Sequence, residues 1–447
     1  MANQLESQPE LRGLRYEPVT APVEVNGLSD IPYGCDCNNL APRFGFAYRL
    51  PEGWGVLRAA YGIHYGQIFP VTYGHARFNP PGNIRVVVSQ PNLADPLGGR
   101  TFEDFDPDDR SSVFALSPDL VAPYSHQYNF SWDLALGDWV ELQLGYVGSR
   151  SHKLFMLWFT NRAQVVPGIP QTTATVNDRR SDPSHFDIFH LINGSRGYYD
   201  AGRVSVALKN WKGLTLNGGY WFSKSIDTGT DYLNTLSSRD ARKGRSQSEF
   251  GVQQDMKGLS NFDQPHSLLV QFSYDTPKLT TSRPASWLAR AFGSWSFSSV
   301  VLAKSGTPFS IRSGSDGPGF GNVDGTGGDR PHVIDPALLG RTIGNPDTSR
   351  DLLPVSAFRF IDPTEPGGNV GRNTFRKGRI ANVNAALSKS WRLSSEKSLT
   401  FRAESVNFLN TPQFAEPSTQ LTSPAFGQIT NTLNDGRAFR FHLRFDF

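Results

Sequence analysis

The last nine residues of the chain, FRFHLRFDF (Phe439–Phe447), alternate strictly between apolar and polar side chains. Successive side chains of an extended strand point to opposite faces, so this stretch has one apolar face and one charged face. A strand of this kind fits a wall with hydrocarbon on one side and water on the other. Its apolar face carries Phe439, Phe441, Leu443, Phe445 and Phe447.

The same alternation, which indicates β-strands, recurs along the chain. Eleven segments show it, and most have 8–11 residues, close to the ~9–11 that a tilted strand needs to cross a bilayer. We therefore predict an all-β, antiparallel transmembrane barrel wall. The segments are 42–50, 55–65, 126–136, 139–147, 202–209, 214–223, 266–275, 294–304, 382–392, 399–407 and 437–447.

The composition agrees with an all-β chain. The 447 residues include 43 Gly and 31 Pro but only 3 Met, so turn formers are plentiful and helix formers are few. The net charge of +3 and the lack of Lys/Arg runs give no sign of nucleic-acid binding. No apolar run reaches the ~18 residues of a membrane helix. The first residues, MANQLESQPELRG, do not have the pattern of a signal peptide.

The connections between the predicted strands alternate between short and long. Short turns near 51–53, 137–138, 210–213 and 394–398 are separated by the long segments 66–125, 148–201, 224–265, 305–381 and 408–436, and 276–293 is intermediate. Outer-membrane barrels have this pattern, with short periplasmic turns and long extracellular loops, whereas a soluble sandwich has no reason to keep it.

Tryptophan supports the same orientation. Trp54, Trp139, Trp211, Trp295 and Trp391 lie beside the short connections, and Trp287 lies in the intermediate one. Indole favours the headgroup layer, so these residues predict an aromatic girdle at the periplasmic rim, where Lys389 could extend its amine to water. The alternative is that these residues flank hairpin turns of a soluble core.

Strand parity predicts that this wall is incomplete. With short turns in the periplasm, both the first and the last predicted strand run from outside to inside. A bacterial single-chain barrel usually has an even strand number. We therefore expect at least one further strand before residue 1. Residues 1–41 are then the remnant of an extracellular loop, and residues 42–447 a partial barrel domain.

Several stretches resemble the C-terminal part of TonB-dependent outer-membrane receptors of the Oar-like, acidobacterial type. They are NNLAPRFGFAY from Asn38, LRAAYGIHYG from Leu57, AKSGTPFSI from Ala303, GDRPHV from Gly328, VGRNTFR from Val370 and FRAESVNFLNTPQFAEP from Phe401. This sequence has His64 and His332 where that family usually has Phe and Asn. The matching positions are Pro42, Arg43, Tyr61, Gly62, Gly306, Pro308, Gly371, Arg372, Asn373, Arg402, Glu404, Asn407 and Asn410.

The resemblance implies half of a 22-stranded barrel whose plug and TonB box lie outside this chain. It also implies that the last strand, from Phe439 to the terminal aromatic Phe447, is the signal read by the outer-membrane insertion machinery. The expected partners are the bilayer with its lipopolysaccharide, that machinery, the plug, TonB and a bulky ligand of unknown identity at the extracellular loops. A surface adhesion module without transport and an outer-membrane hydrolase remain the alternatives.

The candidates for other chemistry are weak, and we expect neither catalysis nor a cofactor. Cys35 and Cys37 lack the second cysteine pair of a zinc site. In SHFDIFH, His185 and His190 flank Asp187 in a predicted long loop, where they are more typical of polar loop residues than of a metal site. The Gly/Asp-rich segment 313–330 fits no EF-hand spacing. The charges expected to face the lumen have mixed signs, typical of a wetted wall; they are Arg43, Arg49, Arg203, Lys209, Glu141, Asp133, Arg402 and Glu404.

Overall fold

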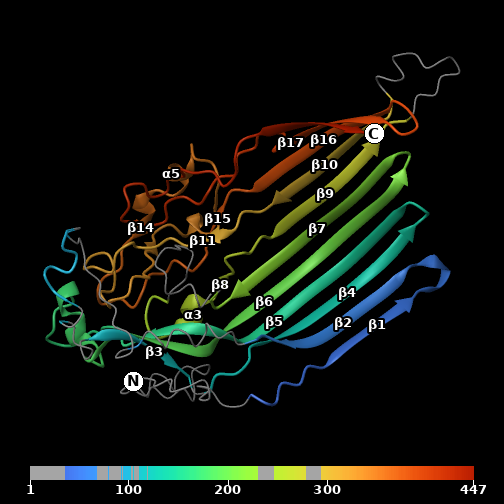
Figure 1. The fold of residues 1–447 in the computed structure, drawn as a ribbon. Helices are drawn as coiled ribbons and strands as arrows, with labels where there is room; N and C mark the ends of the chain where they lie inside the picture. Colours follow the sequence, from blue (N-terminus) through green and yellow to red (C-terminus); the bar gives the residue numbers. More distant parts are fainter. Residues whose placement is uncertain are drawn as a thin grey trace.

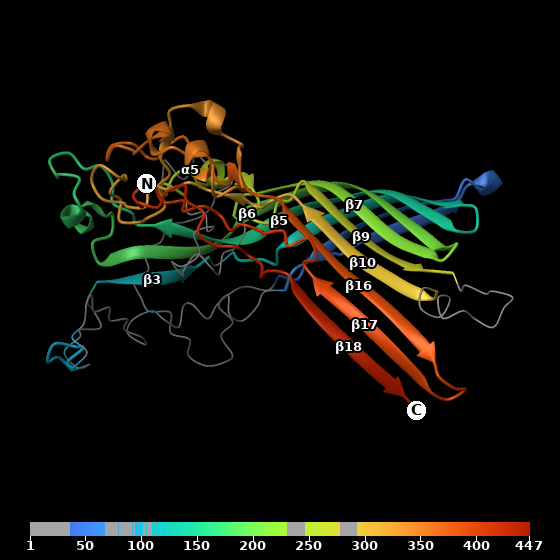
Figure 2. The same cartoon turned by 90° about the horizontal axis from the view of Figure 1, so that it is seen from above.

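A computed structural model describes residues 36–67, 110–117, 119–229, 246–277 and 293–447, together with positions 79, 92, 94–101 and 104. Its main feature is one large curved antiparallel sheet (Figures 1 and 2). Eleven strands follow one another across it in chain order, which confirms the predicted all-β wall. They are β1 (Arg43–Arg49), β2 (Val56–Tyr65), β4 (Tyr124–Leu136), β5 (Val140–Thr160), β6 (His185–Trp211), β7 (Leu214–Asp227), β9 (His266–Asp275), β10 (Trp295–Lys304), β16 (Ile380–Arg392), β17 (Ser398–Val406) and β18 (Ala438–Asp446).

β5 and β6 correct the prediction for residues 148–201. We expected a long loop there, but β5 continues to Thr160 and β6 begins at His185, so most of the segment is strand. Residues 155–160 are buried on both faces, against the apolar neighbours Leu120 and Leu191 on one side and Val252 and Met256 on the other. A strand covered on both faces is continuously apolar and does not alternate, so a period-two pattern misses it.

The short and long connections lie at opposite ends of the sheet (Figure 1). The hairpins β1–β2, β4–β5, β6–β7 and β16–β17 close at one end, which also holds the C-terminus. At the other end, the described parts of the long connections pack together. We call residues 161–184, 228–229, 246–265, 305–379 and 407–437 the cap.

The cap has its own apolar core and small elements. The core is buried and includes Phe309, Ile343, Phe375 and Phe426. Its elements are α3 (Val252–Met256), β8 (Gly258–Leu259), β11 (Pro308–Phe309), β12 (His332–Val333), β13 (Thr342–Ile343), α5 (Ser349–Leu352), β14 (Phe358–Arg359) and β15 (Phe375–Lys377), with 3-10 turns η4 (Thr173–Thr175), η5 (Asn177–Arg179), η7 (Pro336–Leu338) and η8 (Val355–Ala357). β3 (Ser111–Leu116) pairs in parallel with β6 beside it, and η1 (Pro51–Gly53) forms the turn after β1.

The large sheet has two edges, β1 and β18. Within the described residues, β1 pairs only with β2 and β18 only with β17. Because ten antiparallel pairings separate them in the strand order, both edge strands run in the same direction, from the cap to the short turns. Among the described residues, no helix has the length and apolar character needed to cross a membrane.

Candidate functional site

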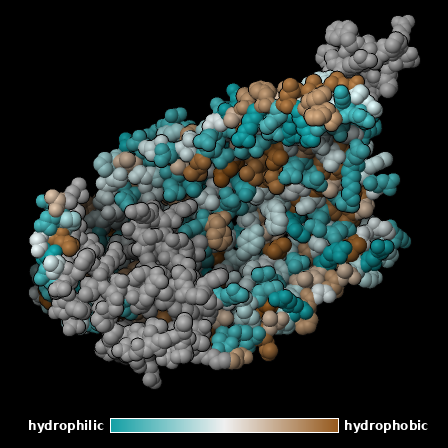
Figure 3. All heavy atoms as spheres, viewed as in Figure 1, coloured by the Kyte–Doolittle hydropathy of each residue, from teal (hydrophilic) through white to brown (hydrophobic). Residues whose placement is uncertain are grey.

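The terminal strand β18 places its apolar side chains on one face of the sheet, as the alternation predicts. The register puts Phe441 beside Ala403, Leu387 and Phe297 in successive strands. Phe441 and Leu443 are 70% and 71% exposed, and Phe439, Phe445 and Phe447 are exposed as well. We call this the apolar face and its reverse the polar face. Hydrophobic residues also gather along the edge of the sheet where Figure 1 shows β16 and β17 (Figure 3). The role of these residues as an assembly signal stays a prediction.

The tryptophans of the predicted girdle lie at the short-turn end in two groups, one exposed and one packed as a pair. Trp54, Trp139 and Trp211 are exposed. Trp295 and Trp391 pack edge to face, with ring centroids 6.4 Å apart. The Lys389 ammonium lies 5.3 and 5.7 Å from these two rings and donates to the carbonyl of Gly293 at 2.6 Å. The Lys389 amine is therefore held in an aromatic niche and does not extend to water, contrary to the expectation. Trp287 lies outside the described residues.

A polar and aromatic cluster near the cap was missed in the sequence. On the apolar face, Arg150 forms an ion pair with Asp200 at 2.9 Å, and the Tyr146 hydroxyl donates to Asp200 at 2.5 Å. Arg150 and Asp200 lie ten and eleven residues above the lower ends of their strands. At ~3.3 Å per residue and a ~40° tilt, that height is about 25 Å, where the apolar band of an outer-membrane barrel ends. A strand-by-strand alternation count does not reveal this cluster, because its side chains come from two different strands.

The family-motif residues Arg372 and Asn373 hold the cap together. Arg372 is 3% exposed and forms an ion pair with Asp227 at the end of β7, while its Nε donates to the carbonyl of Met256 at 2.6 Å. Asn373 has a φ of 56°. Its side-chain amide donates to the carbonyl of Leu259 at 2.6 Å. These residues therefore join two long connections, and Gly371 precedes them in the same turn, where its carbonyl accepts from Thr374.

Three more arginine–aspartate pairs connect segments of the cap. Arg330 pairs with Asp255, Arg376 with the nearly inaccessible Asp263, and Arg162 with Asp324. Each pair joins residues that are more than seventy positions apart. Removing one partner of a buried ion pair leaves the remaining charge buried without a counter-charge, which costs ~3–5 kcal/mol of stability. The arginines of two of these pairs stand in quoted motifs, but nothing in the sequence indicates which aspartate each one reaches.

The remaining motif positions shape the ends of strands. A Cβ on Gly306 would lie 2.1 Å from the carbonyl oxygen of Lys377, so only glycine fits there. Pro308 begins β11 and pairs with Arg376 of β15. Asn407 and Asn410 both have a φ of 52° in the turn that leaves β17. Asn407 accepts from the backbone of Thr411, and Asn410 from that of Arg437.

The motif residues near the first edge have separate roles. The carbonyl of Pro42 accepts from the backbone of Ile63 at 3.0 Å. Gly62 leaves room for Arg43, since a Cβ there would lie 3.1 Å from its Cγ. The Tyr61 hydroxyl lies 2.6 Å from Nδ1 of His126. The structure therefore does not bring the predicted motif residues into one centre.

The Gly/Asp-rich segment 313–330 forms a buried acidic network. Asp324 is paired with Arg162, and Asp316 accepts from the backbone of Asp324 and Gly325. Burial, followed by the charges of Asp324 and Asp316, raises the pKa of Asp329 to about 8. Burial also raises the pKa of Glu249 to about 7. In the described part of the chain, no three acidic, His or Cys side chains are arranged to hold a metal ion.

His185, Asp187 and His190 of the SHFDIFH motif lie on β6 and not in a loop, which corrects the prediction. His185 contacts Asp182 at 3.0 Å, whereas Asp187 forms an ion pair with Arg180 at 2.9 Å. Burial lowers the pKa of His190 to about 4, so its ring is neutral at pH 7. His185 and Asp187 therefore have separate partners in the cap, and the His190 ring packs against Trp158 of β5. Cys37 is disulfide-bonded, and Cys35 lies outside the described residues.

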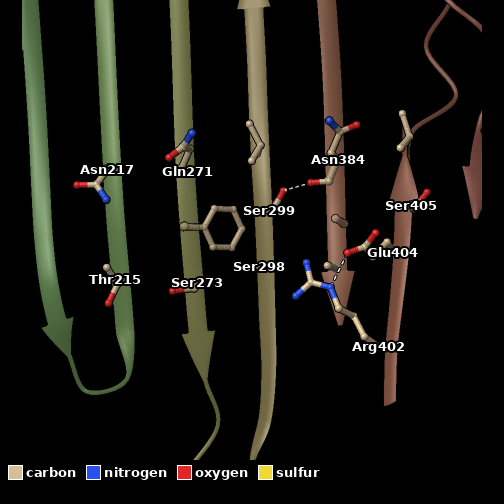
Figure 4. Close-up of a pocket in the computed structure, with 15 residues that line it drawn as sticks. Thr215, Asn217, Gln271, Ser273, Ser298, Ser299, Asn384, Arg402, Glu404 and Ser405 are labelled. Carbon is tan, nitrogen blue, oxygen red and sulfur yellow. Dashed lines mark hydrogen bonds and ion pairs between the residues drawn. The ribbon is translucent and has the colours of Figure 1, made fainter. Parts of the chain in front are cut away.

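The polar face carries ion pairs at both sides and a hollow that the Arg402–Glu404 pair borders. Lys209 pairs with Glu141 and Arg58 with Asp133 on one side, and Arg402 pairs with Glu404 on the other. The hollow, of about 510 Å³, lies over β7, β9, β10, β16 and β17 (Figure 4). Hydroxyl and amide side chains point into it, including Thr215, Asn217, Gln271, Ser273, Ser298 and Asn384.

Comparisons with known proteins agree with this architecture. The sequence profile of the outer membrane beta barrel domain matches residues 7–440. No curated protein matches the chain significantly.

Among solved structures, the chain is similar to the outer membrane transporter YddB from Escherichia coli, with 11% identity and a TM-score of 0.47, over 92% of this chain and 41% of that one. It is also similar to the ferric-catecholate import receptor Fiu from Escherichia coli (11%, 0.38, 90% and 34%) and to the iron transporter FrpB from Neisseria meningitidis (12%, 0.38, 92% and 39%). The chain spans less than half the length of each of these structures.

Proposed function

The chain belongs to the outer membrane β-barrel family, and from this premise we propose that it forms part of the wall of a TonB-dependent receptor. In this proposal residues 42–447 form a partial barrel domain. The apolar face contacts lipid, and the polar face lines the lumen. A bulky ligand binds at the cap side and passes through the barrel when TonB acts on a plug.

The proposal rests on the contacts that the motif residues make within the cap. The stretches that resemble the Oar-like receptors converge on the cap through Arg330, Arg372, Asn373 and Arg376. A simple adhesion module would need exposed loops, but here the loops share a buried core above a membrane-facing wall. A preorganised cap of this kind suits a receptor that holds a ligand at the mouth of a barrel.

Two measurements test the proposal. Heat-modifiable gel mobility and recovery in the outer-membrane fraction are expected if the chain contributes to a barrel wall; recovery as a soluble secreted protein would favour the adhesion alternative.

The second measurement is the DNA sequence upstream of the codon for Met1, together with the 5′ end of the transcript. We expect one reading frame with about eleven further alternating strands, the number that completes the implied barrel, preceded by a plug and a TonB box. A stop codon and a promoter immediately upstream would contradict the TonB-linked part of the proposal.

A further inference from the structure

The polar face has a central stripe without charge. The stripe consists of the polar-face positions of β7 from Thr215 to Ser225, β9 from Ser267 to Ser273, β10 from Ser296 to Leu302 and β16 from Asn382 to Ser390. None of these positions is Asp, Glu, Lys, Arg or His. Because both flanks of the same face carry ion pairs, the absence of charge here is local and needs its own explanation.

The stripe connects two hollows. The lower one is lined by amides and hydroxyls in register, such as Asn217 beside Gln271 and Thr215 beside Ser273, and at its β17 side by the Arg402–Glu404 ion pair (Figure 4). The upper one, of about 330 Å³, lies under the cap and is lined by Tyr199, Trp221 and Phe262 together with Ser223, Gln264 and Ser267. Phe262 is 62% exposed, although it belongs to the cap.

The upper hollow offers rings and hydrogen-bonding groups but no net charge. Asp263 also lines it, but its side chain is 1% exposed and is neutralised by Arg376. The Arg203 guanidinium stacks 5.5 Å from the Trp221 ring centroid. The volume is near the lower end of the ~300–1,000 Å³ of small-molecule sites.

From this arrangement we propose that the stripe and its upper hollow bind a neutral, hydroxyl-rich ligand, an oligosaccharide, and guide it from the cap into the lumen. Sugar hydroxyls both donate and accept hydrogen bonds, as do the Ser, Thr, Asn and Gln side chains along the stripe. Sugar C–H groups carry partial positive charge and pack on the electron-rich faces of Trp and Tyr. A neutral ligand also leaves no charge to be desolvated without a partner.

A ferric chelate or a nucleotide fits this surface poorly. Such anionic ligands need cations in the binding surface. The two arginines nearest to the stripe are committed to Trp221 and to Glu404. Lys304, beside Ser267 at the cap end of the stripe, is a single cation and does not match a ligand with several negative charges. A polypeptide plug could use the same hydrogen-bonding groups. The aromatic hollow directly below the cap favours a ligand that arrives from outside.

The test rests on the proposed function and uses the full chain purified from outer membranes in detergent. Binding to an array of neutral and acidic oligosaccharides is followed by a titration of tryptophan fluorescence with the best neutral probe. We expect Trp221→Ala and Asn217→Asp each to weaken binding about tenfold, which corresponds to about 1.4 kcal/mol. Asn129→Asp is the matched control, because it adds the same charge to the polar face on β4, outside the stripe.

Three results would overturn the inference: no binding to any neutral glycan, tighter binding to acidic ones, or equal weakening by Asn129→Asp. A fourth is that Asn217→Asp lowers only membrane yield and leaves binding unchanged, because the stripe would then be a packing surface for the plug. The proposed function fails separately, if the chain is absent from the outer-membrane fraction.

Discussion

Replacing Leu443 by Arg should block assembly of the wall, whereas removing the neighbouring charge with Arg444→Leu should not. Leu443 lies on the apolar face and is 71% exposed, so it has little protein around it. It stands four residues above Phe447, which at ~3.3 Å per residue and a ~40° tilt is about 10 Å above the lower rim. This is close to the middle of an apolar band of ~25 Å.

The expected losses of folding free energy differ enough to distinguish Leu443→Arg from Arg444→Leu. An arginine on the lipid face near the bilayer midplane costs ~2–4 kcal/mol. Arg444 is 77% exposed on the polar face, and its ion pair with Asp446 is worth at most ~1 kcal/mol. A difference of about 2 kcal/mol corresponds to about thirtyfold in the folding equilibrium.

The assay is the folding yield in phospholipid vesicles, measured by heat-modifiable gel mobility, together with the amount in the outer-membrane fraction. We expect near-native yields for Arg444→Leu and a small residual yield for Leu443→Arg. Equal yields for the two variants would show that the two faces of β18 are not lipid-facing and lumen-facing as we infer, and the reasoning would fail.

Three further predictions concern the cap. Asp227→Asn leaves Arg372 buried without its counter-charge, so we expect a loss of ~3–5 kcal/mol in cap stability, seen as faster limited proteolysis in the cap. An unchanged cleavage rate would contradict a stabilising role of the Arg372–Asp227 ion pair. Gly306→Ala should lower thermal stability because of the contact with Lys377, whereas Gly202→Ala, with nothing within 4 Å of its Cβ, should not; equal melting temperatures would contradict the contact. The folded-state pKa of Asp329, about 8 against 3.8 for the free side chain, means that the contribution of Asp329 to cap stability is full below about pH 4 and falls as pH rises towards 8. Asp329→Asn should reduce that slope in hydrogen exchange measured at pH 6 and 8.5, and an unchanged slope would refute the assignment.

The sequence was sufficient to predict the eleven strands of the wall, because each one alternates and ends at a turn. The same rule failed where β5 and β6 leave the membrane. There the strand is covered on both faces, and its side chains no longer alternate. Residues 155–160 therefore look like a buried segment of either helix or strand when only their sequence is considered.

The candidate site could be predicted only in part. The motif VGRNTFR drew attention to Arg372 and Asn373, and both are structurally important, but their partners Asp227 and Leu259 lie more than a hundred residues away. Register across strands decides which side chains share a surface, and a single sequence does not contain it. The uncharged stripe is a property of four strands together, and for that reason the lumen looked like a uniformly mixed-charge wall.

In the proposed receptor, the direction of the two edge strands of the described sheet limits which strands can complete the barrel. β1 and β18 both run from the cap to the short turns. Two copies of this chain placed side by side would set β1 of one next to β18 of the other in parallel, a pairing foreign to antiparallel outer-membrane barrels. A second copy of this chain is therefore unsuited to close the barrel. In the proposed barrel, the strands that lie between β18 and β1 must be odd in number, and the outer two must both run towards the cap.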